Sequence, residues 1–193
     1  RYNADLLLAT DPDADRVGMA VKNNEGEYQL ITGNQAGLLL LNYICERRTA
    51  LGKMPPEPVL VKSLVSMDLA DRIAESYGVR TINVLTGFKF IGEQILKLEQ
   101  QGKKENYIFG FEESYGYLAG THARDKDAVV ASFLICEMFA FYKTRGISLL
   151  DKLNEIFDKF GFCMNVTYSN ELEGSSGFKK MQDIMVKFRK GAE

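Results

Sequence analysis

The chain has 193 residues, of which 46% are hydrophobic, so it can build a sizeable core in one domain of ordinary size or in one domain and part of another. Its formal net charge is −2 and its lysines and arginines are scattered, which excludes the basic patch that a nucleic-acid-binding protein needs. Its apolar stretches are too short to span a membrane and its first residues show no signal-peptide pattern, so we expect a cytoplasmic protein with neither nucleic acid nor membrane among its partners.

The first predicted elements are strands around an acidic loop. Residues 5–10 form a short apolar run typical of a buried strand, and residues 17–21 and 28–31 predict two more strands with a turn at 23–26 between them. Proline lacks the backbone donor that a central strand needs, so the first strand ends before Pro12. The loop between the first two strands reads Asp11-Pro12-Asp13-Ala14-Asp15-Arg16.

The three aspartates of this loop indicate a metal site. Carboxylates a few ångströms apart repel one another by roughly 4 kcal/mol per pair at an effective dielectric constant of about 20, and a hard divalent cation such as Mg²⁺ or Ca²⁺ offsets most of that repulsion. An EF-hand is excluded because Arg16 and Lys22 stand where its loop needs Gly and Glu. The alternative is a solvated acidic turn with Arg16 as a salt-bridge partner. We predict instead that Asp11, Asp13 and Asp15 bind one metal ion.

Helical and strand patterns alternate through the middle of the chain. Helices are predicted from a cap at Thr32 or Asn34 to Arg48, from a cap at Ser66 to Gly78, and over residues 88–98, 129–142 and 149–160, and strands over residues 59–61, 81–85 and 107–111. The helix at 129–142 is apolar on nearly every side, so we expect it to be buried. The alternation predicts a three-layer α/β domain in which helices flank a largely parallel mixed sheet.

The pattern changes after residue 160. Residues 163–168 predict a strand, residues 174–177 a flexible turn, and the spacing of apolar residues over 178–188 a further helix. We interpret this segment as a linker and the truncated start of another unit. Because the chain begins with Arg1 rather than Met, we expect it to be a piece of a longer protein.

Cysteines and the single histidine narrow the chemistry. Cys45, Cys136 and Cys163 lie far apart and fit neither a zinc pattern nor a disulfide framework, so we expect reduced thiols in the core. His122 is the only histidine, which excludes most Ser-His, Cys-His and zinc-hydrolase mechanisms.

Four polar groups follow predicted strands, where ligands bind in open α/β sheets. The acidic loop is the first of them. The other three are Thr86-Gly87, the cluster Glu112-Glu113-Ser114, and Lys126 at the start of a helix. Carboxylates and a hydroxyl suit hydrogen bonds to sugar hydroxyls, whereas Arg16 and Lys126 are cations that suit phosphate. Taken singly, each group also fits an ordinary structural role, such as a surface loop, a helix cap or a salt bridge.

Together, these motifs carry a resemblance. They resemble four signatures, in the same order, of the α-D-phosphohexomutase superfamily, and within it of phosphoglucomutases of the phosphoglucomutase/phosphomannomutase group: Asp11-Pro12-Asp13-Ala14-Asp15-Arg16, Thr86-Gly87-Phe88-Lys89, Gly110-Phe111-Glu112-Glu113-Ser114-Tyr115-Gly116 and Arg124-Asp125-Lys126-Asp127. These enzymes have four domains. The resemblance implies that residues 1–25 close the second domain and carry the metal loop, that residues 26–160 form the third α/β domain with the sugar-binding loops, and that residues 161–193 are a linker and the truncated start of the next unit.

The resemblance also implies a role for each matching residue. Asp11, Asp13 and Asp15 would hold one Mg²⁺. Arg16 would bind a phosphate of the substrate, and Lys126 would also contact the substrate. Thr86 would lie in the loop that reads sugar orientation, and Glu112 and Ser114 would bind sugar hydroxyls. The implied enzyme is an intramolecular phosphotransferase, an isomerase that interconverts glucose 1-phosphate and glucose 6-phosphate through a phosphoserine and glucose 1,6-bisphosphate.

Departures from the family pattern set the expected limits of this chain. The Thr-Ala-Ser-His-Asn-like loop with the phosphorylated serine and the Arg-x-Ser-Gly-Thr-like phosphate loop are both missing, so we expect the catalytic serine outside this chain and no activity from the chain alone. Its partners would be a hexose phosphate and the remaining domains of the same polypeptide. Phe111 and Tyr117 differ from some subgroups, which leaves a phosphomannomutase or phosphopentomutase open. A non-catalytic sugar-phosphate-binding paralogue and a structural Ca²⁺-binding module are further alternatives.

Overall fold

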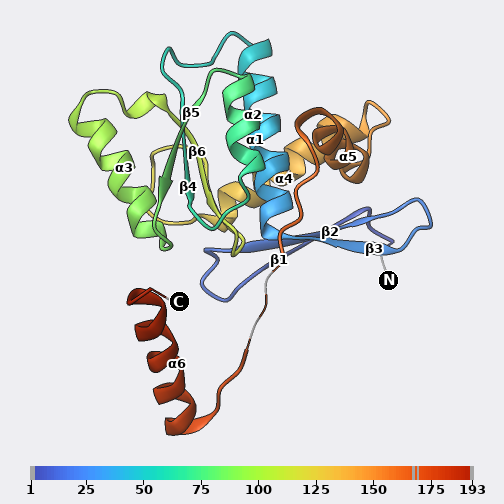
Figure 1. Ribbon diagram of the computed structural model, residues 1–193. Helices are drawn as coiled ribbons and strands as arrows, with labels where there is room; N and C mark the ends of the chain where they lie inside the picture. The colour runs from blue at the N-terminus through green and yellow to red at the C-terminus, as the bar shows by residue number, and fades with distance from the viewer. Residues whose placement is uncertain (1–2, 167, 169, 192–193) are drawn as a thin grey trace. The chain divides into compact units, whose positions relative to one another are not determined.

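A computed structural model describes residues 3–166, 168 and 170–191. It divides into two compact units, one up to Cys163 and one from Met164 onward (Figure 1). The first contains β1 (Leu6–Thr10), β2 (Val17–Lys22), β3 (Tyr28–Ile31), α1 (Gly33–Ala50), β4 (Val59–Ser63), α2 (Leu69–Ser76), β5 (Arg80–Val84), α3 (Phe88–Gln100), the 3₁₀ helix η1 (Lys104–Asn106), β6 (Tyr107–Glu112), β7 (Gly116–Leu118), α4 (Ala128–Lys143) and α5 (Leu149–Phe160), and the second contains α6 (Gly174–Arg189). No helix in these described ranges is long and apolar enough to cross a bilayer.

The larger sheet confirms the predicted fold class. Its strand order is β5-β4-β6-β7, with β4 parallel to both β5 and β6 and with β7 antiparallel to β6. In Figure 1, α3 lies on one side of this sheet and α1 and α2 lie on the other, which gives the three layers. The short strand β7 was not predicted, because three residues cannot establish a period of two.

A second, antiparallel sheet of order β1-β2-β3 carries the acidic loop. Leu6 pairs with Val21 and Thr10 with Val17, so β1 and β2 form a hairpin whose connection is residues 11–16. An isolated bridge between Arg16 and Gly116 joins this hairpin to the start of β7 in the larger sheet. The three predicted strands around the acidic loop are therefore confirmed, and the loop faces the edge of the α/β domain. The predicted burial of the first strand is wrong, because β1 is the edge strand of this sheet and its residues are half-buried or exposed.

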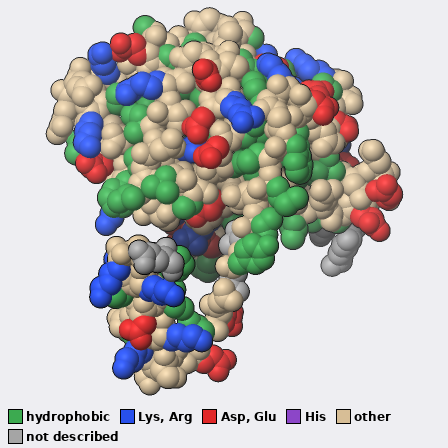
Figure 2. Space-filling model, viewed as in Figure 1, with side chains coloured by type: hydrophobic (Ala, Val, Ile, Leu, Met, Phe, Trp, Pro, Cys, Tyr) green, Lys and Arg blue, Asp and Glu red, His purple; other side chains and the backbone are tan. Residues whose placement is uncertain are grey.

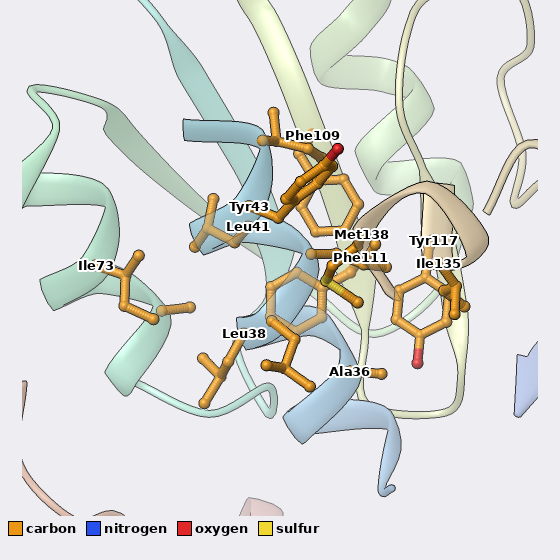
Figure 3. Close-up of a cluster of buried hydrophobic side chains, with 14 of the residues drawn as sticks. Ala36, Leu38, Leu41, Tyr43, Ile73, Phe109, Phe111, Tyr117, Ile135 and Met138 are labelled. Atoms are coloured by element: carbon orange, nitrogen blue, oxygen red, sulfur yellow. The ribbon is translucent and has the colours of Figure 1, made fainter. Parts of the chain in front are cut away.

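The main core surrounds α1, which is apolar on several sides because other elements contact it on each of them. Residues 38–41 of α1 are completely buried, and Figure 3 shows Leu38 and Leu41 among side chains from α2, α4 and β6. The helix begins with a capping box in which Thr32 and Gln35 exchange hydrogen bonds, so Thr32 rather than Asn34 is the cap. A second cluster, between the sheet and α3, includes Val59 and Ile95.

Two predictions about the helices of the α/β domain are wrong. Ser66 does not cap α2, which begins at Leu69 after Asp68; the buried Ser66 hydroxyl pairs with another serine instead. Nor is α4 buried all round, because Val129 and Phe133 on one face are 70% and 69% exposed. The buried residues of α4 recur every three to four positions, so the helix contacts the core along one side only.

The predicted core thiols are only partly confirmed. Cys45 is buried, and burial raises the pKa of its thiol to about 12. Cys163 is half-buried. Cys136 is exposed on the outer side of α4, contrary to the prediction, for the same reason that Phe133 is exposed there.

In the second unit the helix is confirmed but the elements before it are wrong. The described residues of 163–168 form no strand, and residue 167 lies outside the described residues. The Gly174–Gly177 segment is the first turn of α6 rather than a flexible turn. A Cβ at Gly177 would lie 2.5 Å from the carbonyl carbon of Leu172, so glycine here permits close chain approach rather than a bend. Figure 2 shows blue Lys and Arg side chains gathered over α6. The domain boundaries at 25 and 160 stay a prediction.

Candidate functional site

The acidic loop brings its three aspartates together within a short span of backbone. The backbone N–H of Ala14 donates to the carbonyl of Asp11 at 3.0 Å, and Ala14 adopts a left-handed conformation with φ +55°. The backbone N–H of Arg16 donates to Oδ1 of Asp11 at 3.1 Å, which lowers the pKa of the Asp11 carboxyl. As a result, one carboxylate oxygen from each of Asp11, Asp13 and Asp15 lies within 4.8 Å of the others.

This arrangement fits a hard divalent cation. Oδ1 of Asp15 is buried and has no hydrogen-bond partner among the described residues, so a lone pair is available where water does not reach it. Three carboxylate oxygens at this spacing are the ligand type that Mg²⁺ and Ca²⁺ prefer. Metal binding by Asp11, Asp13 and Asp15 stays a prediction. The spacing of their carboxylate oxygens is the one that such a metal site requires.

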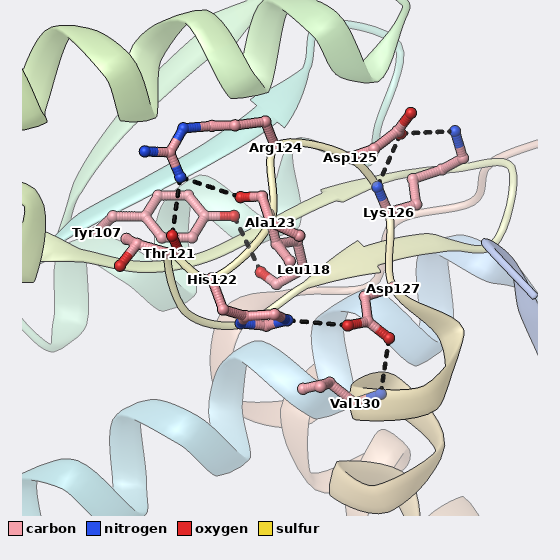
Figure 4. A network of polar contacts seen from close by, with 10 residues as sticks. All are labelled: Tyr107, Leu118, Thr121, His122, Ala123, Arg124, Asp125, Lys126, Asp127 and Val130. Carbon is pink, nitrogen blue, oxygen red and sulfur yellow. Dashed lines mark hydrogen bonds and ion pairs between the residues drawn. The ribbon is translucent and has the colours of Figure 1, made fainter.

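Lys126 lies against the acidic loop. Its Nζ is 2.9 Å from Oδ2 of Asp15 and 3.1 Å from Oδ1 of Asp125, as Figure 4 shows for the second pair. Burial alone would lower the pKa of Lys126, but hydrogen bonds to these carboxylates raise it above its ordinary value, so the side chain is cationic at neutral pH. Gly116 makes room for it, because a Cβ there would lie 2.2 Å from Cδ of Lys126.

Arg16 joins the acidic loop to the turn between β6 and β7. Its backbone forms the bridge to Gly116, and the next residue, Val17, donates its N–H to the carbonyl of Tyr115 at 3.2 Å. The Arg16 guanidinium is 3.8 Å from Asp15, with 53% of its side chain exposed. Arg16 therefore presents a cation to solvent directly beside the three aspartates.

The two other predicted sugar-binding loops also meet. Glu112, at the end of β6, is 5% exposed, and its Oε1 accepts a hydrogen bond from the Gly87 N–H at 2.6 Å. Gly87 has φ +121° and precedes α3, and the adjacent Thr86 is exposed. One oxygen of Glu112 is thus occupied by the β5–α3 loop, while Ser114 is half-buried in the turn after β6.

The structure brings the predicted residues together in two groups. Asp11, Asp13, Asp15, Arg16 and Lys126 form one cluster, and Glu112 with the Thr86–Gly87 loop forms the other. The backbone contacts between residues 16–17 and 115–116 connect them. Among the described residues, neither Thr86 nor Ser114 hydrogen-bonds another predicted site residue.

Sequence reasoning assigned no role in binding to several residues that support this site, although it expected Asp125 and Asp127 to favour the start of the following helix. Asp125 holds Lys126 at 3.1 Å. The exposed His122 pairs with Asp127 at 2.8 Å, and the same carboxylate caps α4 by accepting the Val130 N–H at 2.9 Å (Figure 4). The Arg-Asp-Lys-Asp motif already contained Asp125 and Asp127, but only Lys126 was singled out. The distance of 2.8 Å from His122 to Asp127 comes from a loop geometry that no sequence period encodes.

Comparisons with known proteins identify the family of this chain. Residues 32–160 match the family described as "Phosphoglucomutase/phosphomannomutase, alpha/beta/alpha domain III". The chain is 41% identical over 189 residues to the phosphoglucomutase of Staphylococcus aureus, an alignment that covers 98% of this chain and 33% of that protein. The chain therefore spans about a third of the length of the curated relatives that it matches.

Two solved structures share the fold. Parafusin, a phosphoglucomutase from Paramecium, superposes with a TM-score of 0.64 at 19% identity, over 96% of this chain and 30% of that one. The N-acetylphosphoglucosamine mutase of Aspergillus fumigatus, solved with GlcNAc-6P and magnesium, superposes with a TM-score of 0.54 at 13% identity, over 78% of this chain and 35% of that one. Since the family match covers most of the chain, the protein belongs to the phosphoglucomutase/phosphomannomutase family of the α-D-phosphohexomutase superfamily, and residues 32–160 are its third α/β/α domain.

Proposed function

We propose that this chain is the central part of a phosphoglucomutase, which interconverts glucose 1-phosphate and glucose 6-phosphate. The observation that carries the proposal is the cluster of Asp11, Asp13 and Asp15 beside two cations, Arg16 and Lys126. Anionic oxygens for a metal and cationic groups for phosphate are both needed for phosphoryl transfer, where catalysis is mainly positioning and charge stabilisation. The identity of 41% to a phosphoglucomutase supports the same assignment.

Each group has a chemical part in this proposal. The three aspartates would hold one Mg²⁺, which supplies positive charge beside the phosphoryl group when bound. Arg16 would bind a phosphate through its planar, bidentate donor set, for which its exposed guanidinium is suited. Lys126 is protonated and would donate to an oxygen of the substrate. That the fungal relative was solved with a sugar phosphate and magnesium supports both ligand classes.

Sugar hydroxyls would be bound at the second group of residues. Glu112 keeps one carboxylate oxygen beyond its bond to Gly87, and Ser114 and Thr86 each carry a hydroxyl that can donate and accept. These groups stand at the carboxyl ends of β5 and β6, which lie on either side of β4 and run parallel to it. The carboxyl ends of parallel strands are the position where α/β proteins bind ligands. They would orient the sugar of the substrate through its hydroxyls.

The complete reaction requires a phosphoserine from another part of the polypeptide. Its phosphoryl group would transfer to O6 of glucose 1-phosphate, giving glucose 1,6-bisphosphate and a free serine. The bisphosphate would turn around, and its 1-phosphoryl group would return to the serine to leave glucose 6-phosphate. No atom is gained or lost over the cycle. The bisphosphate would be the intermediate of the cycle and also its activator.

The test is turnover by the complete polypeptide that contains this chain. We expect it to convert glucose 1-phosphate faster than mannose 1-phosphate or ribose 1-phosphate in the presence of Mg²⁺, and we expect no turnover by the 193-residue chain alone. Faster turnover of another sugar phosphate would reassign the substrate. No turnover of any of them, together with retained sugar-phosphate binding, would identify a non-catalytic paralogue instead.

A further inference from the structure

Glu113 has no role in the proposed chemistry, although its neighbours Glu112 and Ser114 would both bind the sugar. Glu112 is the last residue of β6, and Glu113 is the first residue of the turn that follows. Glu112 reaches the β5–α3 loop, whereas Oε2 of Glu113 accepts a hydrogen bond from the Ser63 hydroxyl at 2.9 Å. Ser63 is the last residue of β4, fifty positions earlier in the chain.

A second serine continues this contact into the interior. The hydroxyl oxygens of Ser63 and Ser66 are 2.7 Å apart, and the two residues are 0% and 2% exposed. Each hydroxyl has a single proton, and a carboxylate accepts hydrogen bonds without donating one. The Ser63 proton therefore goes to Glu113, so Ser66 must donate to Ser63. The three side chains form one directed chain of hydrogen bonds from Ser66 through Ser63 to Glu113.

A buried lysine holds the far end of this chain. Nζ of Lys62, a residue with no exposed surface, donates to the Ser66 carbonyl at 3.3 Å and lies 3.5 Å from a carboxylate oxygen of Asp71. An unpaired buried ammonium is very costly, so Lys62 and its partners are held in place together. The backbone N–H of Met67 also donates to the Asn34 side chain at 2.9 Å, which fixes the β4–α2 loop against α1.

The backbone of Glu113 is held as tightly as its side chain. Gly33, the first residue of α1, lies so close that a Cβ there would be 2.0 Å from the Glu113 carbonyl oxygen. Two residues later, Tyr115 adopts φ +67°, a conformation that residues other than glycine adopt rarely. Three residues around the turn thus contact three different neighbours, since Glu112 binds the β5–α3 loop, Glu113 binds β4, and the Tyr115 carbonyl accepts a hydrogen bond from Val17 at the start of β2.

We propose that Glu113 and Ser63 are positioning residues, which fix the Glu112–Ser114 turn so that its sugar-binding groups keep one orientation toward the metal loop. The expected effect on sugar binding rests on the proposed function, whereas the anchoring of the turn by Glu113 and Ser63 does not. A displacement of about 1 Å at a site of this kind costs up to about a hundredfold in kcat/KM. Chains of hydrogen bonds in buried surroundings reinforce one another, so the loss of one member loosens the others.

The first experiment measures anchoring directly, by amide hydrogen exchange of the 193-residue chain. Glu113→Ala should raise exchange about tenfold or more over residues 111–117 while leaving α1 unchanged. Ser63→Ala should act on the same residues and on 64–67. Glu113→Gln keeps an oxygen that accepts from Ser63 and should restore most of the protection. Glu105→Ala, an exposed residue of η1, is the matched control. Exchange of the turn within about twofold of wild type in both alanine variants would overturn the inference.

The second experiment uses the complete polypeptide and its steady-state kinetics with glucose 1-phosphate. We expect Glu113→Ala to raise KM about tenfold with kcat changed less than about threefold, because the turn binds the sugar in ground and transition states alike. A merely structural defect would reduce the folded fraction, lowering kcat at unchanged KM. Glu113→Gln should have a KM near that of wild type. If the wild-type polypeptide is inactive, the proposed function fails, and the exchange measurement alone decides whether Glu113 anchors the turn.

Discussion

The acidic loop and the β6–β7 turn lie side by side but are built differently. In the loop, Asp11, Asp13 and Asp15 converge through bonds within six consecutive residues, such as the Arg16 N–H to Asp11. The turn instead depends on Ser63, Gly33 and Gly87, which are far away in sequence. A site made of local contacts can lose a functional group without losing its shape, whereas one made of distant contacts cannot.

The largest expected effect tests the loop side of this comparison. Asp13→Asn should lower kcat of the complete polypeptide by about a thousandfold or more, because it removes a negative ligand from the metal that offsets phosphoryl charge. In the 193-residue chain, calorimetry should show weakened Mg²⁺ binding. The melting temperature without metal should stay the same or rise, since one like-charge repulsion is removed.

Asp158→Asn, an exposed position on α5, controls for the loss of one negative charge. A fall in melting temperature for Asp13→Asn alone would mean that the carboxylate supports the fold of the loop. The two regions would then be alike rather than different.

The next effect tests the turn side. Gly33→Ala introduces a Cβ that would lie 2.0 Å from the Glu113 carbonyl, so the turn or α1 must shift. Overpacking of this kind costs roughly 1–3 kcal/mol, and we expect that loss in the free energy of unfolding measured with denaturant. Gly26→Ala serves for comparison because nothing lies within 4 Å of its Cβ, although its φ of +81° adds some backbone strain. Equal losses for the two variants would show that the close approach at Gly33 is relieved without cost.

The smallest effect lies at the start of α4, which the acidic loop and β7 both contact through backbone hydrogen bonds. Burial raises the pKa of Asp127, but hydrogen bonds from Val130 and His122 outweigh it and leave the pKa below its ordinary value. A depressed carboxyl pKa adds stability above the unfolded-state value near 3.8, and this is lost as the pH falls through the folded-state value. Asp127→Asn should therefore cost about 1 kcal/mol or less near neutral pH.

That difference between wild type and Asp127→Asn should shrink as the pH falls from about 6 to about 2, measured by denaturant titration at each pH. A difference that stays constant over this range would assign the loss to helix capping geometry and not to the charge of the carboxylate.

How far the sequence could predict this molecule follows the same division. The hairpin and the α/β alternation follow from residue patterns with spacings of two to four, and both predictions are confirmed. The acidic triplet has a similarly short spacing, and its geometry fits the predicted metal site. The Ser66 hydroxyl was assigned to a helix cap because capping is its usual local role, but a partner three residues earlier takes it. The pairing of Ser63 with Glu113 spans fifty positions and has no signature in the sequence.

Exposure was the other property that local patterns predicted poorly. The composition of α4 indicates burial on all sides, yet Phe133 and Cys136 are exposed because the neighbouring elements contact only one side of the helix. The β-branched and aromatic residues before α6 indicate a strand, but the described residues there have no neighbouring strand to pair with. A hydrophobic pattern indicates that a residue can be buried, but the topology determines whether a neighbouring helix or strand covers it.

Ala14 and Tyr115 share the left-handed backbone conformation, one in the loop and one in the turn. Each costs about 1 kcal/mol relative to an ordinary conformation, a cost that glycine would avoid. Glycine would also widen the range of conformations open to the unfolded chain, so the net gain in stability would be small. Efforts to stabilise this protein by relaxing strained backbone would therefore gain little here, and would soften the two segments that place the carboxylates and hydroxyls.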